Sequence, residues 1–213
     1  MERKKEIEQA FYSIMKDVYT EQNLQTIPKK YHDLFNMFGR FYPLINYISQ
    51  SGLKKGLDFG CGCAITVVLG KLMGLDITGI DTHDSGSKSR NSYRKICKGL
   101  SVPDCIYTGI QNDLRAKGYI IINRNTGDFP WSEFKDDAFE FMCSYWGLNT
   151  NHSDKECDFK LRYQELIRIT KPKGIWYIWP GIDDLIINNV HNKLQEKEII
   201  IKNWVKRDIL YSK

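Results

Sequence analysis

The sequence predicts an α/β protein in which helices cover both faces of a mostly parallel sheet. Residues 54–81 read as a buried strand, a glycine-rich turn, an apolar helix and a second strand. Short apolar runs at 119–123 and 138–144 follow, separated by stretches of helical pattern. At 213 residues the chain is long enough for one domain with a full core. We divide this domain into an N-terminal helical cap, residues 1–50, and an α/β core, residues 51–213.

The composition is that of an ordinary globular protein, with 42% hydrophobic and 13% aromatic residues. No apolar run reaches the roughly 18–20 residues of a membrane span, and the first ten residues lack a signal peptide's apolar segment. We therefore expect a cytoplasmic protein with no membrane span. The net charge of +5 is mild and no basic run is interleaved with aromatics, which argues against a nucleic-acid partner. The six cysteines form no C-x-x-C pair, so we expect free thiols and no metal.

The N-terminal cap is predicted to be helical. Between Glu6 and Tyr19 apolar residues recur at helical spacing, and Ile27-Pro28 breaks the pattern. A second helical region, roughly Tyr31 to Ser49, is rich in aromatic residues. We expect the first helix to pack on the sheet and also to cover a ligand pocket as a lid.

The segment from Lys54 to Asp81 organises the core. Gly60 and Gly62 follow the first strand and allow the backbone to turn sharply beside a ligand. Ala64 to Met73 is the predicted helix, and Asp81 closes the next strand, 21 residues after Gly60. A carboxylate at that place can accept hydrogen bonds from both ribose hydroxyls of a nucleoside.

The residues around the turn distinguish between nucleosides. A dinucleotide fingerprint needs a small residue at position 65, where Ile65 stands, and the small residue is Ala64. Asp58 repels a pyrophosphate but suits a ligand that carries an ammonium group and a sulfonium centre. No Gly-Lys-Ser/Thr follows, so the turn is not a P-loop. A glycine turn in another kind of α/β protein remains an alternative at this point.

The pattern D-x-G-x-G-x-A with an acidic strand end resembles the S-adenosylmethionine site of class I methyltransferases. Two later stretches resemble motifs of the same family in the same order. Gly127–Trp131 and the strand Ala138–Ser144 resemble the family's G-D-x-x-x-L-P-F stretch, with Glu140 where the family usually has Asp. Glu165–Trp179 resembles E-x-x-R-V-L-K-P-G-G and its strand, with Lys173 in place of the first glycine. The resemblance covers about residues 50 to 180 and is closest to small-molecule enzymes, including those of quinone biosynthesis.

The resemblance implies a fold and a cofactor. The fold is a Rossmann-like seven-stranded sheet, mostly parallel with an antiparallel C-terminal strand, under an N-terminal helical lid. The last two strands would come from the runs 198–204 and 208–211. The cofactor is S-adenosyl-L-methionine, with Asp128 facing the adenine amino group and Phe129 supplying a backbone N–H. The cofactor-binding residues that we expect are Asp58, Gly60, Cys61, Gly62, Asp81, Thr82, Asp128, Phe129 and Ser144.

The acceptor side offers fewer signals. Methyl transfer is mainly a matter of positioning, and a base is needed only when the acceptor must lose a proton. Candidate bases are His152, His83, His32 and Asp154, of which His152 matches a His often found in this group shortly after the fourth strand. A helix-capping or surface role explains His152 equally well. Tyr145 and Trp146 are candidates for the floor of the acceptor pocket, or are simply core residues.

The acceptor class follows by elimination. No N/D-P-P-Y/F follows the fourth strand, Cys143 lacks the preceding proline of cytosine-C5 enzymes, and no paired glutamates suggest arginine methylation. A hydroxyl or amine of a small metabolite remains, such as a sugar or a cell-surface precursor. Two alternatives stay open: an RNA methyltransferase that uses the basic ends of the chain, and a non-catalytic protein that binds S-adenosylmethionine.

Overall fold

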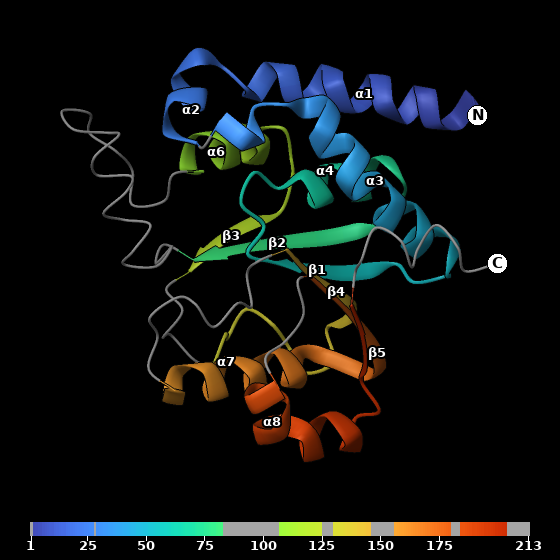
Figure 1. Ribbon diagram of the computed structural model, residues 1–213, viewed down its shortest axis with the longest axis vertical. Helices are drawn as coiled ribbons and strands as arrows, with labels where there is room; N and C mark the ends of the chain where they lie inside the picture. Colours follow the sequence, from blue (N-terminus) through green and yellow to red (C-terminus); the bar gives the residue numbers. More distant parts are fainter. Residues whose placement is uncertain are drawn as a thin grey trace.

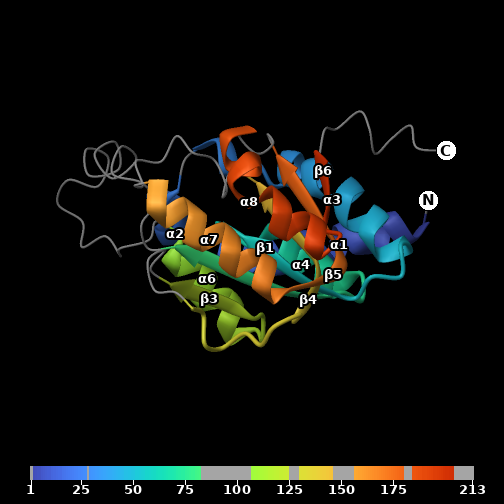
Figure 2. The same ribbon diagram turned by 90° about the horizontal axis from the view of Figure 1, so that it is seen from below.

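The computed structural model describes residues 2–27, 29–82, 107–124, 130–145, 156–179 and 184–203. Its centre is a six-stranded sheet of order β3-β2-β1-β4-β5-β6, and every neighbouring pair is parallel. The strands are β1 (Lys55–Phe59), β2 (Asp76–Thr82), β3 (Ile121–Arg124), β4 (Phe139–Tyr145), β5 (Thr170–Trp179) and β6 (Ile200–Asn203). Figures 1 and 2 show helices on both faces of this sheet, which confirms the predicted α/β layers.

Two apolar clusters lie on the two faces of the sheet. One is built with α1 (Glu2–Val18), α3 (Leu34–Gln50), α4 (Ile65–Leu72) and α6 (Thr108–Ala116). The other is built with α7 (Glu156–Ile169) and α8 (Asp184–Glu196), which lie below the sheet in Figure 1. The alternation of β4 divides its side chains between the faces, because Phe141 belongs to the first cluster and Met142 to the second.

The N-terminal cap is part of the first cluster. Helix α1 confirms the predicted amphipathic segment, and it buries Phe11, Met15 and Val18 completely. Between α1 and α3 lie a short 3-10 helix, Lys29–Tyr31, and α2, Glu21–Thr26, which the sequence analysis did not predict. The chain therefore covers this face of the sheet with helices that share its core.

Glycines set the closest contacts of the central strands. The ring of Phe141 on β4 lies so close to Gly56 on β1 that a Cβ at position 56 would stand 2.1 Å from it. At Gly79 on β2 a Cβ would stand 2.9 Å from the Cys61 sulfur and 3.0 Å from Val67. The start of α4 thus reaches the sheet because β2 carries no side chain there.

The stretch Lys171–Gly174, which corresponds to K-P-G-G in the resembling family and was expected to precede the strand, lies inside β5. Thr170 already pairs with Phe139, and Ile175 pairs with Phe141, so residues 171–174 stand opposite the single residue Glu140. These four residues form an irregularity within β5 and do not precede it. Lys173 there has φ +62°, a conformation that explains the glycine usual in the resembling family.

The C-terminal strands also differ from the expectation. The described residues form six strands, all parallel, in place of seven strands with an antiparallel member. Strand β6 confirms the run at 198–204 and pairs with β5 from Ile175↔Ile200 to Ile178↔Asn203. The run at 208–211 lies outside the described residues, so the seventh strand stays a prediction.

The E-x-x-R motif, Glu165 to Arg168, stabilises the fold. Arg168 donates hydrogen bonds to both carboxylate oxygens of Glu165, to Asp136, and to the carbonyls of Trp131 and Phe134. Glu165 also accepts a 2.7 Å bond from the Trp131 N–H. The hydrogen bonds and the paired charges lower the pKa of Glu165, against the effect of burial. This network fastens the segment before β4 onto α7.

Candidate functional site

The glycine turn lies against the end of β2. The N–H groups of Gly60 and Cys61 donate to the Ile80 carbonyl, at 2.8 and 3.0 Å. Gly60, Gly62 and Ala64 have φ angles of +75°, +51° and +55°, which let the chain reverse into α4 within a few residues. Asp81 follows Ile80 in β2. The glycine turn and Asp81 therefore lie together at the carboxyl edge of the sheet, where parallel sheets bind ligands.

A glutamine that the sequence analysis missed joins Asp81 to this turn. The Nε2 group of Gln111, on α6, donates to Asp81 Oδ2 at 2.8 Å and to the Gly62 carbonyl at 2.9 Å. Gln111 is completely buried, and its Oε1 has no hydrogen-bond partner among the described residues. Its signal in the sequence was a polar residue on the apolar face of α6, next to the buried Ile110.

Aromatic residues approach the same turn. A Cβ at Gly62 would stand 3.5 Å from the ring of Tyr107, so this ring lies over the turn. Tyr107 in turn makes an edge contact with Tyr31 of the N-terminal cap, with 6.2 Å between the ring centroids. The cap thus reaches the turn through Tyr107.

Asp58 lies just beneath the turn, on β1, and is 3% exposed. The Thr66 hydroxyl of α4 donates to Asp58 Oδ2. Burial raises the pKa of Asp58 to about 7; the Thr66 hydrogen bond opposes this rise, and the charge of Asp81 adds to it. Asp58 therefore braces β1 against α4, and its carboxyl titrates near neutral pH.

Ser144 and Cys143 belong to the scaffold of β4. The Ser144 hydroxyl donates to the Phe59 carbonyl at 2.9 Å, and Ser144 is 1% exposed. The Cys143 thiol lies 3.6 Å from the Leu57 carbonyl, and burial raises its pKa. A thiol that stays protonated is a poor nucleophile, so Cys143 is a core residue of β4.

Tyr145 ends β4 within an aromatic group. Its ring stacks on Trp179, the last residue of β5, at 4.8 Å and 12°, and receives the edge of Phe41 at 5.2 Å. Arg40 of α3 donates to the Tyr145 hydroxyl at 2.6 Å, and its guanidinium lies 5.3 Å from the centre of that ring. Tyr145 is thus held in one position on the β4–β5 half of the carboxyl edge.

Of the remaining predicted residues, the structure describes Thr82 and His32. Thr82 is the last residue of β2, next to Asp81, and pairs with Arg124. His32 donates from Nε2 to the Ile27 carbonyl at 3.0 Å, which gives it a place in the cap. The remaining candidates lie outside the described residues and stay predictions: His83, Asp128, Phe129, Trp146, His152 and Asp154.

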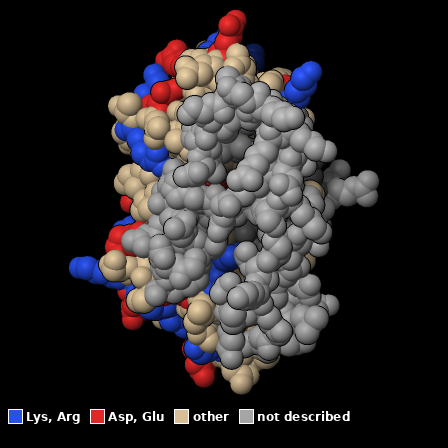
Figure 3. Space-filling model, turned by 90° about the vertical axis from the view of Figure 1, so that its left-hand side faces the viewer, with Lys and Arg blue, Asp and Glu red and all other residues tan. Residues whose placement is uncertain are grey.

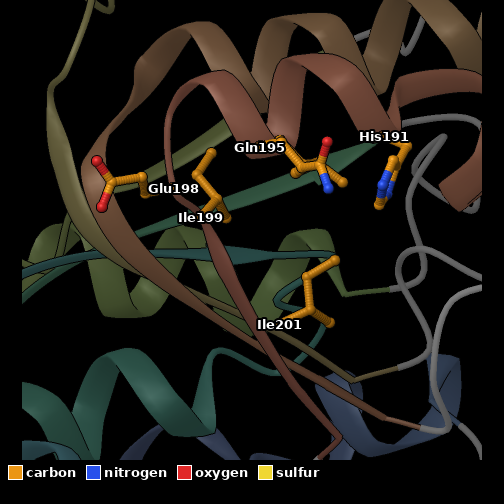
Figure 4. A pocket seen from close by; sticks show the side chains of 6 residues that line it. His191, Gln195, Glu198, Ile199 and Ile201 are labelled. Atoms are coloured by element: carbon orange, nitrogen blue, oxygen red, sulfur yellow. The ribbon is translucent and has the colours of Figure 1, made fainter.

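A shallow, open pocket of about 620 Å³ lies elsewhere, between α8 and β6 (Figure 4). None of the predicted site residues lines it; its walls are His191, Leu194, Gln195, Glu198, Ile199 and Ile201.

Across the described part of the chain, no three or more His, Cys, Asp or Glu side chains gather as a metal site would require. None of the described helices is long and apolar enough to cross a membrane. Among the described residues visible in Figure 3, basic and acidic side chains are mixed.

Several solved structures resemble the fold. The PH0226 protein from Pyrococcus horikoshii OT3 is 17% identical, with a TM-score of 0.45 over 84% of this chain and 67% of its own. CalS10, an amino pentose methyltransferase from Micromonospora echinaspora with S-adenosylmethionine bound, is 10% identical, with a TM-score of 0.46 over 75% and 59%. A methyltransferase from Aquifex aeolicus is 16% identical, with a TM-score of 0.41 over 75% and 80%.

The chain spans 48% to 67% of the length of the first four structures compared. No family model matches the sequence, and no curated protein is similar to it.

Proposed function

We propose that this protein is an S-adenosylmethionine-dependent methyltransferase that acts on a hydroxyl or amine of a small metabolite. The observation that carries the proposal is the arrangement of Asp81, Gln111 and Gly62 at the ends of β1 and β2. Asp81 is a carboxylate at the ribose position, and the buried Gln111 fixes it beside the glycine turn. Gln111 Oε1, which has no hydrogen-bond partner within the described ranges, adds an acceptor that suits a ligand rich in O–H and N–H donors.

A dinucleotide is the closest competing ligand, because the strand order 3-2-1-4-5-6 also occurs in dinucleotide-binding folds. Two residues favour the nucleoside with a sulfonium. Ile65, buried in the first turn of α4, occupies the place of the third fingerprint glycine. Asp58, one strand away from Asp81, adds a carboxyl group that a pyrophosphate would have to approach.

The proposed roles follow the positions along the edge. Gly60, Cys61 and Gly62 supply backbone beside the amino-acid part of the donor, and Asp81 with Thr82 binds its ribose. Asp128 and Phe129 are the proposed adenine contacts. The segment from Ser144 to Trp146 is the proposed neighbour of the methyl group, although the Ser144 hydroxyl itself is bonded to the Phe59 carbonyl. Bound S-adenosylmethionine supplies a methyl group on a good leaving group, so the chain's task is to align the acceptor and exclude water.

A base is needed only for some acceptors. If the acceptor is a hydroxyl, His152 is the proposed group that takes its proton. Replacing His152 by Ala should then lower turnover by ~10²–10⁴-fold and leave donor affinity unchanged.

Calorimetry with the demethylated donor tests the proposal. We expect wild type to bind S-adenosylhomocysteine in the micromolar range and not to bind NAD. Asp81→Ala should weaken binding by about 1.5–3 kcal/mol, the effect of losing a charge-assisted two-point contact. Gln111→Leu should weaken it less, because Asp81 remains but is no longer held in place. Asp76→Ala is the matched control, since Asp76 is exposed at the opposite end of the same strand.

Tight NAD binding without S-adenosylhomocysteine binding would contradict the proposal. Donor binding without methylation of any acceptor by the wild type would favour the non-catalytic alternative.

A further inference from the structure

We propose that Arg40 is an anion-binding residue and that the acceptor carries a carboxylate or phosphate group, an inference that rests on the proposed function. Arg40 is half-buried on α3. Its described hydrogen bond and ring contact are both with Tyr145: 2.6 Å to the hydroxyl and 5.3 Å to the centre of the ring. The guanidinium has no acidic partner among the described residues.

The Arg40 side chain is preorganised to bind a carboxylate or a phosphate group. A guanidinium has five N–H donors in a rigid fork that fits carboxylate and phosphate oxygens, and the Tyr145 hydroxyl engages only one nitrogen, Nη1. The stack of Tyr145 on Trp179 and the edge of Phe41 hold this tyrosine rigid. Arg40 is thereby oriented before any ligand arrives, which reduces the entropy lost on binding.

The position of this group indicates which ligand it serves. Tyr145 and Trp179 are the last residues of β4 and β5 and pair with each other across the sheet. The proposed donor site occupies the β1–β2 half of the same edge, around Asp81. An anion on Arg40 therefore lies on the acceptor's side of the edge, and the anionic group would orient the acceptor without taking part in methyl transfer.

Lys202 offers a matched control on the same face. It donates to the Tyr47 hydroxyl at 3.2 Å and lies 5.4 Å from the centre of that ring, so it also combines a cation with a tyrosine. It belongs to the edge strand β6 and pairs with Tyr177, two residues before the end of β5. Lys202→Met removes a comparable charge and leaves the carboxyl edge intact.

The test is an NMR titration of the full-length protein labelled with ¹⁵N. The Nε–H signal of Arg40, assigned with Arg40→Lys, is followed during addition of inorganic phosphate and, separately, of benzoate. We expect a saturable shift with at least one probe, and the stronger of the two identifies the anion as phosphate or carboxylate. In Arg40→Met that affinity, followed by backbone amide signals, should fall ~10-fold, as for one lost charge-assisted pair. Arg40→Lys should restore part of it, and Lys202→Met should retain the wild-type value.

The absence of a saturable shift with either probe would overturn the inference, and so would an equal loss in Lys202→Met and Arg40→Met. S-adenosylhomocysteine binding is measured on the same samples. A wild type that binds an anion at Arg40 but no S-adenosylhomocysteine would contradict the proposed function and leave the anion site standing.

Discussion

Asp58 lies in surroundings that destabilise the ionised form of its carboxyl group. It is buried beneath the glycine turn, and burial raises its pKa to about 7, with a further contribution from Asp81. A carboxyl group with a raised pKa binds more protons in the folded state than in the unfolded state. Its contribution to stability is therefore complete below the unfolded value of about 3.8 and is lost as the pH rises through about 7.

Asp58→Asn should remove this pH dependence. The amide keeps an oxygen that can accept from Thr66 but carries no charge. Between pH 4 and 7 the free energy of unfolding of wild type should fall relative to that of the variant, by on the order of a few kcal/mol. Urea unfolding at several pH values measures this difference, with Asp76→Asn as an exposed control. Parallel pH profiles for wild type and Asp58→Asn would show that the buried carboxyl does not titrate as described.

At the level of residues, the sequence predicted groups whose role depends on their place along one strand or turn. Gly60, Gly62 and Asp81 are such groups, and the structure brings the turn and Asp81 together. Gln111 was missed because its role depends on a contact 30 residues away, from another helix. Arg40 was missed for the same reason, since Tyr145 lies 105 residues further along the chain.

At the level of elements, the C-terminal end of α7 is capped by the side chain of Lys197, the residue that follows α8. The Lys197 ammonium donates to the carbonyls of Ile167, Arg168 and Thr170, each at 2.9 Å, and to Asp137. The last carbonyls of a helix have no partner within the helix and carry partial negative charge, so a cation there is favourable. One lysine thus joins α7, the start of β5 and the segment before β4.

Lys197→Met should therefore destabilise the protein by about 1–3 kcal/mol, because it leaves several carbonyls without their charged donor. The methionine keeps most of the apolar length of the lysine, so the loss reports on the ammonium. Lys193→Met, on the exposed surface of the last turn of α8, should change stability by less than about 0.5 kcal/mol. Chemical denaturation of both variants tests the prediction, which a similar small effect of the two changes would refute.

Periodic patterns in the sequence predicted most helices and strands. They failed for features whose position depends on tertiary contacts. The two strands that flank α4 and the helices α1, α3 and α4 were found at or near the predicted residues. Helix α2 has only six residues, and they are mostly polar; its place is fixed by Asn23, which bonds to the Val18 carbonyl and to Asp113 of α6. The irregularity in β5 depends on Glu140, which accepts from the N–H groups of Lys54 and Lys55 and pairs with Lys171.

At the level of the whole molecule, the N-terminal cap shares the core of the sheet. Phe11, Met15 and Val18 have no exposed surface, and Asp17 pairs with Lys117 beyond the end of α6. A lid that opened by detaching α1 would expose these side chains, at about 1.5–3 kcal/mol for each large apolar residue. Any movement that admits a ligand should therefore leave α1 in place.

Native-state hydrogen exchange should show this directly. We expect the slowest amides of α1 to exchange with the same opening free energy as those of β4, and with the same dependence on denaturant, because both require global unfolding. Exchange of the exposed N-terminal turn of α1 serves as the internal reference for local fraying. Opening of the centre of α1 at much lower free energy than β4 would mean that the helix detaches as a separate unit.

The contact between Gly56 and Phe141 has a consequence for how this sequence can diverge. The Phe141 ring fills the place where any other residue at 56 would put its Cβ, and both positions are buried in the central pair of strands. A single substitution at Gly56 should therefore destabilise the fold, whereas a joint change to a larger residue at 56 and a smaller one at 141 keeps the volume constant. Related sequences, once aligned, should show these two positions substituting together, with one side small whenever the other is large. In the laboratory, Phe141→Leu should restore the free energy of unfolding that Gly56→Ala lowers. Sequence divergence and protein stability would then reflect the same packing constraint.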